Sequence, residues 1–210
     1  MSAGPSRRRW HELWADLDAT GSSDAVYDDL VMRHAEPARA YHTFRHVALC
    51  LAELDTVRAR LARPAEAEAA IWLHDAEYDP RAADNEERSA DLAEAIFARA
   101  GVAPERRARI RRLILATAHH VRPDPEQDAA YVVDSDLAIL GSAPGMFDDY
   151  AAAIRREYAF IPEPQYRAAR RVILANFLER PVIYSTAPFR ERYEAAARSN
   201  IARAVARLTD

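Results

Sequence analysis

The chain has 210 residues, of which 50% are hydrophobic and 30% are charged, and its formal net charge is −4 at pH 7. This length is sufficient for one domain with a well-buried core, and the composition is ordinary for a globular protein. The net negative charge gives no reason to expect a nucleic-acid backbone as the partner. All 29 basic residues are arginine, which excludes a lysine nucleophile of the Schiff-base type.

The single cysteine, Cys50, cannot form an internal disulfide, so nothing indicates an oxidising compartment. It lies in an apolar stretch, where we expect a small buried thiol. The basic N-terminal residues are not followed by an apolar run, which argues against a signal peptide. No stretch approaches the roughly 20 apolar residues that span a bilayer. We therefore predict a cytoplasmic protein with no membrane partner.

The elements predicted along the chain are helices separated by short breaks at proline or glycine. Apolar residues recur at helical spacing, beginning with Trp10, Leu13, Trp14 and Leu17. Pro64 and Pro104 suit the first turn of a helix. We predict helices over residues 10–17, 26–33, 43–61, 64–75, 85–101, 104–118, 131–140, 147–158, 164–178 and 188–208.

The segment 131–140 is the one ambiguous element. Its residues Tyr131, Val132 and Val133 have strand propensity. However, the sequence contains no second convincing strand with which it would pair. We therefore predict a helix here, and an all-α fold for the chain.

The residues that indicate chemistry are histidines and aspartates near helix ends. His74 and Asp75 end an apolar helical segment, where a carboxylate is costly unless it is paired or bound to a cation. His46 lies one helix earlier, and Asp134 and Asp136 lie in the apolar segment downstream. Asp134 and Asp136 cannot share one helix face, so we expect one of them to point inward. Two imidazoles and two carboxylates suit a divalent ion such as Mn, Fe, Co, Ni or Zn.

The order H…HD…D on an all-helical chain resembles the HD superfamily of metal-dependent phosphohydrolases. Five blocks of the sequence are similar to those of one bacterial branch, which consists of predicted phosphohydrolases. The resemblance covers roughly residues 40–200. The blocks are YHTFRH at 41–46, WLHDAEYD at 72–79, NEERSA at 85–90, AHH at 118–120 and VDSDLAILG at 133–141.

The resemblance implies a single HD-type helical domain over residues 1–210, with a metal-binding core at about 40–141 and C-terminal helices at about 146–208. His46, His74 and Asp75 match the first histidine and the HD doublet of the family. Asp136 is the best match to the terminal aspartate, with Asp134 as the alternative. The implied activity is hydrolysis of a phosphate ester or phosphoanhydride, with a nucleotide or another small phosphorylated metabolite as substrate.

The family blocks also supply candidates for the general base and for a second metal. Glu86 and Glu87 lie in the block where a carboxylate would take a proton from the attacking water. They differ by about 100° on a helix, so only one would face the site, and we favour Glu87. His119 and His120 are candidates for a second metal or for contact with the substrate phosphate. Because they are adjacent they face different directions, which favours one ion.

Three further residues are candidates for substrate binding. Arg45 and Arg88 would bind phosphate through two parallel hydrogen bonds, or else are ordinary surface arginines. His42 precedes His46 by four residues and would share its helix face if the helix begins early enough. Its alternative role is a cap near the helix start.

The predicted cofactor is therefore one divalent transition metal ion, with Mg²⁺ left open, and the predicted partner is a small phosphorylated molecule. The sequence leaves a homo-oligomer open. Two alternatives are an HD-fold di-iron oxygenase, which needs His119 or His120 to complete a second site, and a non-catalytic sensor that binds a nucleotide or a metal. His11 and His34 have no neighbouring ligand types, and we expect both at the surface.

Overall fold

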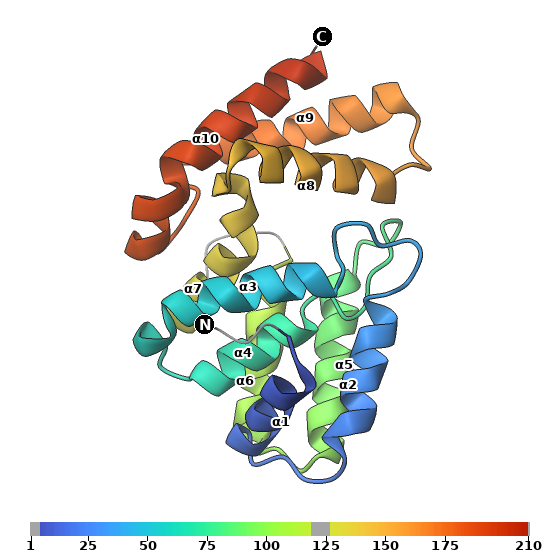
Figure 1. Cartoon of the computed structure of the whole chain (residues 1–210), viewed down its shortest axis with the longest axis vertical. Helices are drawn as coiled ribbons and strands as arrows, with labels where there is room; N and C mark the ends of the chain where they lie inside the picture. The colour runs from blue at the N-terminus through green and yellow to red at the C-terminus, as the bar shows by residue number, and fades with distance from the viewer. Residues whose placement is uncertain (1–4, 119–126, 210) are drawn as a thin grey trace. The chain divides into compact units, whose positions relative to one another are not determined.

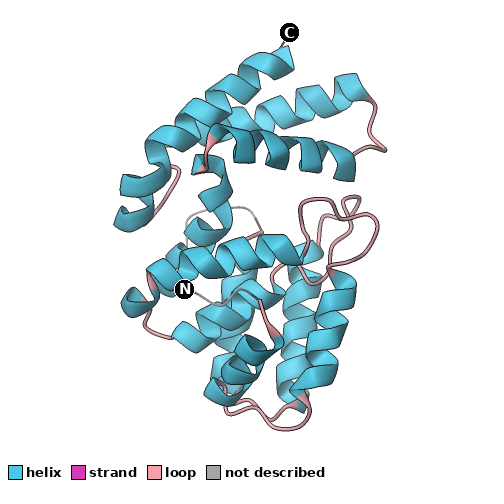
Figure 2. Cartoon of the chain, viewed as in Figure 1, coloured by secondary structure: helices cyan, strands magenta, loops and turns pink. Residues whose placement is uncertain are grey.

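The computed structural model describes residues 5–118 and 127–209, and the regular structure of these residues is helical (Figures 1 and 2). The all-α prediction is confirmed. None of the described helices has both the length and the apolar character needed to cross a membrane. The helices are α1 (Arg7–Asp16), α2 (Ser23–Arg33), α3 (Phe44–Thr56), α4 (Pro64–Leu73), α5 (Asn85–Arg99), α6 (Pro104–Leu115), α7 (Gln127–Leu137), α8 (Pro144–Glu157), α9 (Glu163–Glu179) and α10 (Ala187–Thr209), with short 3₁₀ helices η1 (Arg58–Arg60) and η2 (Ala138–Gly141).

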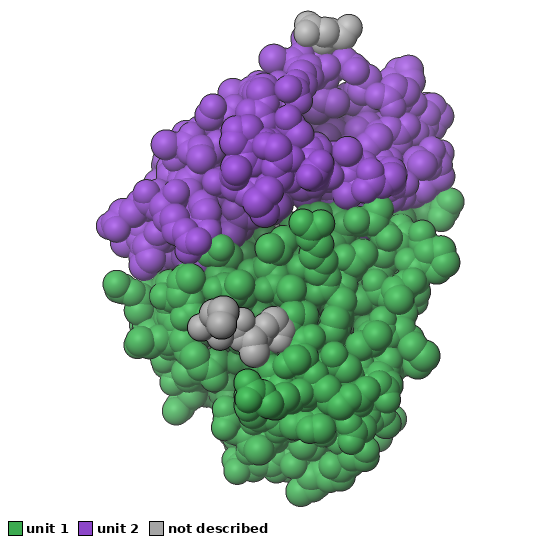
Figure 3. Space-filling view, in the orientation of Figure 1, with its two compact units in different colours: residues 1–136 green, residues 137–210 purple. Residues whose placement is uncertain are grey.

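The chain divides into two compact units, residues 1–136 and residues 137–210 (Figure 3). The first unit contains α1 to α6 and all of α7 except its last residue. The second contains η2 and α8 to α10. A single domain with a metal-binding core at about residues 40–141 stays a prediction.

Helix α4 is the central element of the first unit. Pro64 occupies its first turn, as the sequence predicts, and each residue from Glu66 to Leu73 is buried. A helix that is buried on all sides belongs to a core. Trp72 of α4 packs edge to face against Trp10 of α1, with ring centroids 5.2 Å apart. This pair connects the first helix of the chain to the centre of the unit.

The two glutamates of α4 are buried and both are paired with arginines. Glu68 Oε1 accepts a hydrogen bond of 2.8 Å from Arg9 Nε, and its Oε2 accepts one of 2.5 Å from Arg58 Nη1. Glu66 Oε1 accepts one of 3.1 Å from Arg106 Nε. A buried carboxylate without a partner would be strongly destabilising. These pairs therefore fix α4 against α1, η1 and α6.

The segment with strand propensity is helical, as predicted. Helix α7 and the 3₁₀ helix η2 together cover residues 127–141. Tyr131, Val132 and Val133 are all buried in α7. Strand propensity is largely a preference for well-packed, partly buried surroundings. The core provides such packing for these side chains in a helix, so their strand propensity does not prevent helix formation.

In the second unit, η2 lies directly against α10. A Cβ atom on Gly141 would lie 2.6 Å from Tyr193 Cβ and 2.8 Å from the Tyr193 carbonyl oxygen. The buried Asn200 of α10 donates from Nδ2 to the carbonyl oxygens of Leu140 and Ser142, at 3.0 and 2.9 Å. Only glycine permits this close approach of the two backbones.

We predict that Gly141→Ala lowers the free energy of unfolding by about 1–3 kcal/mol, because the added methyl group overpacks against the backbone of α10. Gly145→Ala is the matched control: the same methyl group there has no neighbour within 4 Å. The control is expected to leave stability unchanged or to raise it by up to about 1 kcal/mol. Urea denaturation of both full-length variants measures the difference, and equal midpoints would contradict the prediction.

Candidate metal centre

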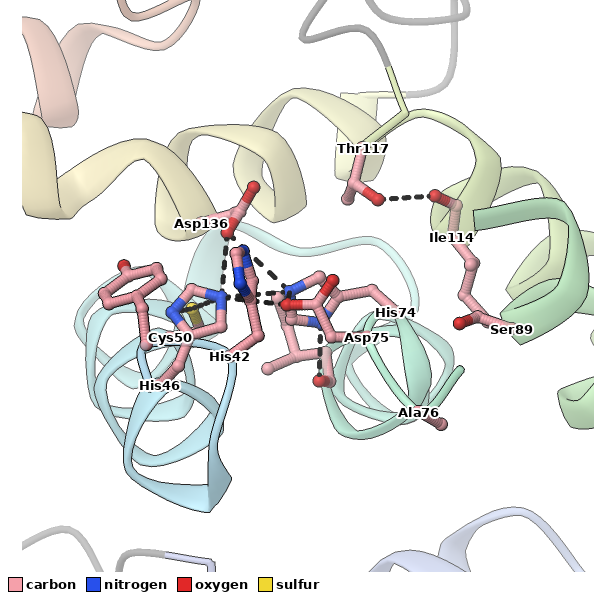
Figure 4. A network of polar contacts seen from close by, with 12 residues as sticks. His42, His46, Cys50, His74, Asp75, Ala76, Ser89, Ile114, Thr117 and Asp136 are labelled. Carbon is pink, nitrogen blue, oxygen red and sulfur yellow. Dashed lines mark hydrogen bonds and ion pairs between the residues drawn. The ribbon is translucent and has the colours of Figure 1, made fainter. Parts of the chain in front are cut away.

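Three helices of the first unit bring four predicted ligands together (Figure 4). His46 lies in the first turn of α3, which begins after the N-cap residue Thr43. His74 is the C-cap residue of α4, and Asp75 follows it. Asp136 is the penultimate residue of α7. The residues come from distant parts of the sequence, and their side chains point toward one another.

The distances between these side chains are those of ligands around one ion. His46 Nε2 lies 3.1 Å from His74 Nε2, 3.3 Å from Asp75 Oδ2 and 3.1 Å from Asp136 Oδ1. His74 Nε2 lies 3.1 Å from Asp75 Oδ2 and 3.7 Å from Asp136 Oδ1. Metal bonds of about 2.0–2.2 Å separate neighbouring ligand atoms by about 2.9–3.6 Å, depending on the coordination geometry. Four of these five distances lie in this range, and the fifth, from His74 to Asp136, is 3.7 Å, so the cluster has about the size of a divalent-metal site.

The hydrogen bonds of the site leave metal-binding lone pairs free. His74 Nδ1 lies 2.9 Å from the carbonyl oxygen of Ile71, so Nδ1 carries the proton and Nε2 presents its lone pair. Asp75 Oδ2 is buried and makes no hydrogen bond, although both imidazoles are within ion-pair distance. A buried carboxylate oxygen of this kind needs a cation or a donor. The residues thus fit a bound divalent ion.

Cys50 also borders this cluster, and the sequence did not indicate it as a ligand. It is 1% exposed, as expected for a buried thiol. Suitable donor atoms of His46, Cys50, His74 and Asp136 all lie within 4.8 Å of one another. The available signal was the spacing of four residues between His46 and Cys50, which places both on one face of α3.

A second residue that sequence reasoning missed is Arg39. Its side chain is fully buried, and Nη1 donates to the carbonyl oxygens of His42 and Asp75 at 3.1 and 2.6 Å. Nη2 donates to the carbonyl oxygen of Ala76 at 3.0 Å. One guanidinium group therefore connects the backbone before α3 to the backbone that carries the HD doublet.

His42 lies beside the cluster but not on the helix. Because α3 begins at Phe44, His42 precedes both the helix and its N-cap residue, so the predicted shared helix face does not form. Its ring centroid is 5.8 Å from that of His46 and 4.2 Å from that of Tyr78, on which it stacks. This stacking holds the imidazole next to the ligands (Figure 4).

Among the described residues, three further candidates for catalysis or substrate binding are exposed and one is half-buried. Arg45 and Arg88 are exposed, and Arg88 Nη2 donates to Glu77 Oε2 at 3.0 Å. Glu86 and Glu87 lie in the first turn of α5, where Glu86 is half-buried and Glu87 is exposed. The roles of all four residues stay predictions.

Both candidate aspartates of α7 are enclosed: Asp134 is fully buried and Asp136 is 13% exposed, because α7 is buried around most of its circumference. Asp136 Oδ1 is the oxygen that lies 3.1 Å from His46 Nε2. One expectation about burial, the exposure of His34, is wrong. His34 is buried instead of exposed: its Nδ1 lies 2.8 Å from the carbonyl oxygen of Leu30, and burial lowers its pKa to about 4. His11 is exposed, as predicted. His119 and His120 lie outside the described residues.

The charges of the site shift the pKa values of its members. Burial opposes protonation of His74, but Asp75 and Asp136 outweigh it and hold the pKa of His74 well above its usual value. The pKa of His46 is likewise raised, against burial, by Cys50, Tyr41 and the two carboxylates. Burial opposes ionisation of Asp75, yet the neighbouring histidines hold its pKa well below the usual value. The three shifts have one cause, the attraction between imidazoles and carboxylates that are enclosed together.

Comparisons with known proteins identify no relative: no family model matches the chain, and neither the curated proteins nor the solved structures contain a match. The geometry of the site therefore carries the functional argument.

We predict that metal stabilises the protein more strongly at higher pH. In the folded chain without metal, the pKa values of His46 and His74 are raised above the value of about 6.5 that they have in the unfolded chain. Protonation of these two residues therefore adds to the free energy of unfolding. This contribution is complete below about pH 6.5 and is lost as the pH rises through the raised pKa values. A metal must displace these protons, so proton competition weakens as pH rises. The shift in melting temperature on adding Zn²⁺ should be larger at about pH 8 than at about pH 6. Equal shifts at the two pH values would contradict this prediction.

We predict that Arg39→Gln weakens metal binding by about 10–100-fold, because loss of the guanidinium group frees the backbone that carries Asp75. Arg39→Lys should recover only part of the affinity, since an ammonium group cannot reproduce the planar fork of donors. Arg45→Gln, at an exposed position, is the control. Titration with Zn²⁺, together with thermal melting to verify folding, measures the effect. Unchanged affinity in a folded Arg39→Gln variant would refute the positioning role.

Proposed function

We propose that this protein is a divalent-metal-dependent hydrolase that acts on a phosphate ester or phosphoanhydride, such as a nucleotide or another small phosphorylated metabolite. The observation that carries the proposal is the convergence of His46, His74, Asp75 and Asp136 around one position, with Asp75 Oδ2 buried and without a hydrogen bond. The order of these residues along the chain, which resembles that of the HD phosphohydrolases, supplies the reaction class.

A divalent cation in such a site lowers the pKa of a water molecule and polarises a phosphoryl oxygen. The chain supplies the charge balance and the orientation. The carboxylates of Asp75 and Asp136 offset the charge of the ion, and the hydrogen bond from His74 Nδ1 fixes one imidazole. The carbonyl contacts of Arg39 hold the backbone at Asp75.

The unequal exposure of the ligands supports a catalytic rather than a purely structural centre. The side chains of His46 and His74 are 2% exposed, whereas those of Asp75 and Asp136 are 13% exposed. On this proposal, water and substrate approach the ion from the side of the two carboxylates. Catalytic metal sites need such access for water and substrate, whereas structural sites are closed by protein ligands. On this proposal His42, whose ring centroid lies 5.8 Å from that of His46, contacts the substrate.

We predict that Asp75→Ala abolishes metal retention and metal-dependent hydrolysis while the fold stays helical, because the ion loses a charged ligand. Phosphate and pyrophosphate release from a panel of nucleotides and phosphorylated metabolites, with Mn, Co, Ni, Mg or Fe(II) supplied, measures activity. Asp91→Ala is the control: it removes an exposed aspartate of α5 that pairs with Arg111 at the surface. The control should keep both metal and activity.

The outcomes separate the proposal from its alternatives. Metal-dependent release by the wild type and by Asp91→Ala, but not by Asp75→Ala, supports the hydrolase. Activity in Asp75→Ala would refute the site, and loss of all helical signal in that variant would make the metal structural. Iron-dependent oxygen uptake without phosphate release would replace hydrolysis with oxygenation. Tight nucleotide binding without turnover would indicate a sensor.

A further inference from the structure

The second unit contains an arginine whose partners among the described residues are aromatic rather than acidic. Arg170 of α9 donates from Nη2 to the hydroxyl oxygen of Tyr150 on α8 at 2.6 Å, and its guanidinium carbon lies 5.4 Å from the centroid of the same ring. Tyr158 and Tyr166 are also close enough to act on its charge. Aromatic rings stabilise a cation that lies against them, but they do not neutralise its charge.

Arg155 of α8 shows how a structural arginine of the same unit is bonded. Its Nε donates to Glu163 Oε2 at 2.7 Å, and its Nη1 and Nη2 donate to the carbonyl oxygens of Tyr158 and Ile161 at 2.7 and 3.1 Å. Its guanidinium carbon also lies 4.5 Å from the ring centroid of Tyr166. Every nitrogen of Arg155 therefore has an acceptor within the protein, and the residue fixes the turn between α8 and α9.

The guanidinium group of Arg170 differs because most of its donors remain open. It carries five N–H groups, and Nη2 uses one of them for Tyr150. Within the described part of the chain, Nε and Nη1 have no acceptor and no carboxylate pairs with the group. Neither nitrogen is among the enclosed polar atoms that lack a partner, so both reach the surface. Arg170 therefore presents a fixed, uncompensated cation to another molecule.

We propose that Arg170 anchors an anion-binding site of the second unit and that this site takes a phosphate group. Tyr150 holds the guanidinium group, and the open N–H groups bind two oxygens of the anion in parallel. Carboxylate and phosphate both match this fork, but a phosphate group carries about −1.5 to −2 charge at pH 7 and three acceptor oxygens. A guanidinium group whose charge no carboxylate offsets attracts it more strongly. The inference does not depend on the metal centre.

The test titrates the metal-free, full-length protein with inorganic phosphate, methyl phosphate and, at the same ionic strength, acetate, and it follows binding by calorimetry. We expect saturable binding of phosphate by the wild type. Arg170→Gln should weaken it by about tenfold or more, because charge-assisted hydrogen bonds are lost. Arg171→Gln is the matched control: it removes an exposed arginine at the next position of the same helix and should keep the affinity. Tyr150→Phe should weaken binding less, because it removes only the hydroxyl group that holds the guanidinium.

Arg170→Lys provides a second variant if Arg170→Gln does not fold, as judged by far-UV circular dichroism. It keeps the charge but not the planar fork, and should bind phosphate more weakly than the wild type. Methyl phosphate that binds as tightly as inorganic phosphate supports the phosphate group of a larger molecule as the ligand, and binding of inorganic phosphate alone supports the free ion. Unchanged affinity in the folded Arg170 variants, or no saturable binding by the wild type, overturns the site. Acetate that binds as tightly as phosphate overturns the choice of ligand.

Discussion

The burial of α4 from Glu66 to Leu73 is the constraint on which the first unit depends. A helix buried on every side must find partners inside the protein for each charge that it carries and for the carbonyl groups at its end. Arginines from α1, η1 and α6 provide partners for Glu66 and Glu68. At the C-terminal end, the imidazole of His74 provides a partner for the Ile71 carbonyl group. The polar contacts that make α4 stable in the core therefore also orient its last side chains.

The loop after α4 is likewise held by polar contacts that folding requires, here those of Arg39. Arg39 is buried because its donors satisfy three backbone carbonyl groups, those of His42, Asp75 and Ala76. These carbonyl groups belong to the two segments that present the candidate ligands. A contact required for folding thus fixes the geometry of the site, and the positions of His46 and Asp75 are set by backbone bonding as well as by side-chain packing.

The sequence predicted the helices well because their signals are local. Apolar spacing and the prolines at helix starts indicated α4 and α6 closely, and the placement of His74 and Asp75 after an apolar run indicated the centre. Arg39 and the burial of His34 could not be found in this way. Their environments are formed by segments far apart in the sequence: Arg39 contacts residues 36 and 37 positions away.

The choice between Asp134 and Asp136 shows the same limit more sharply. Local periodicity says that the two carboxylates point in different directions, but not which direction leads to His46. That is decided by how α7 is anchored. Asp128, near its start, accepts hydrogen bonds from the backbone N–H groups of Ala62 and Arg63, just before α4. The rotation of α7 follows from this anchor, and it brings Asp136 to the histidines.

The contacts that hold α4 and α7 also indicate what a metal ion would contribute. In small zinc modules the ion brings the ligands together and folding depends on it. Here two of the helices that carry ligands are held by contacts that involve no ion: α7 by the hydrogen bonds of Asp128, and α4 by its packing against Trp10 and by the contact of Arg39 with the backbone at its end. The chain's own packing and hydrogen bonds thus hold two imidazoles and two carboxylates toward one another. An ion bound in such a site would contribute chemistry more than cohesion, as the proposed catalytic centre requires.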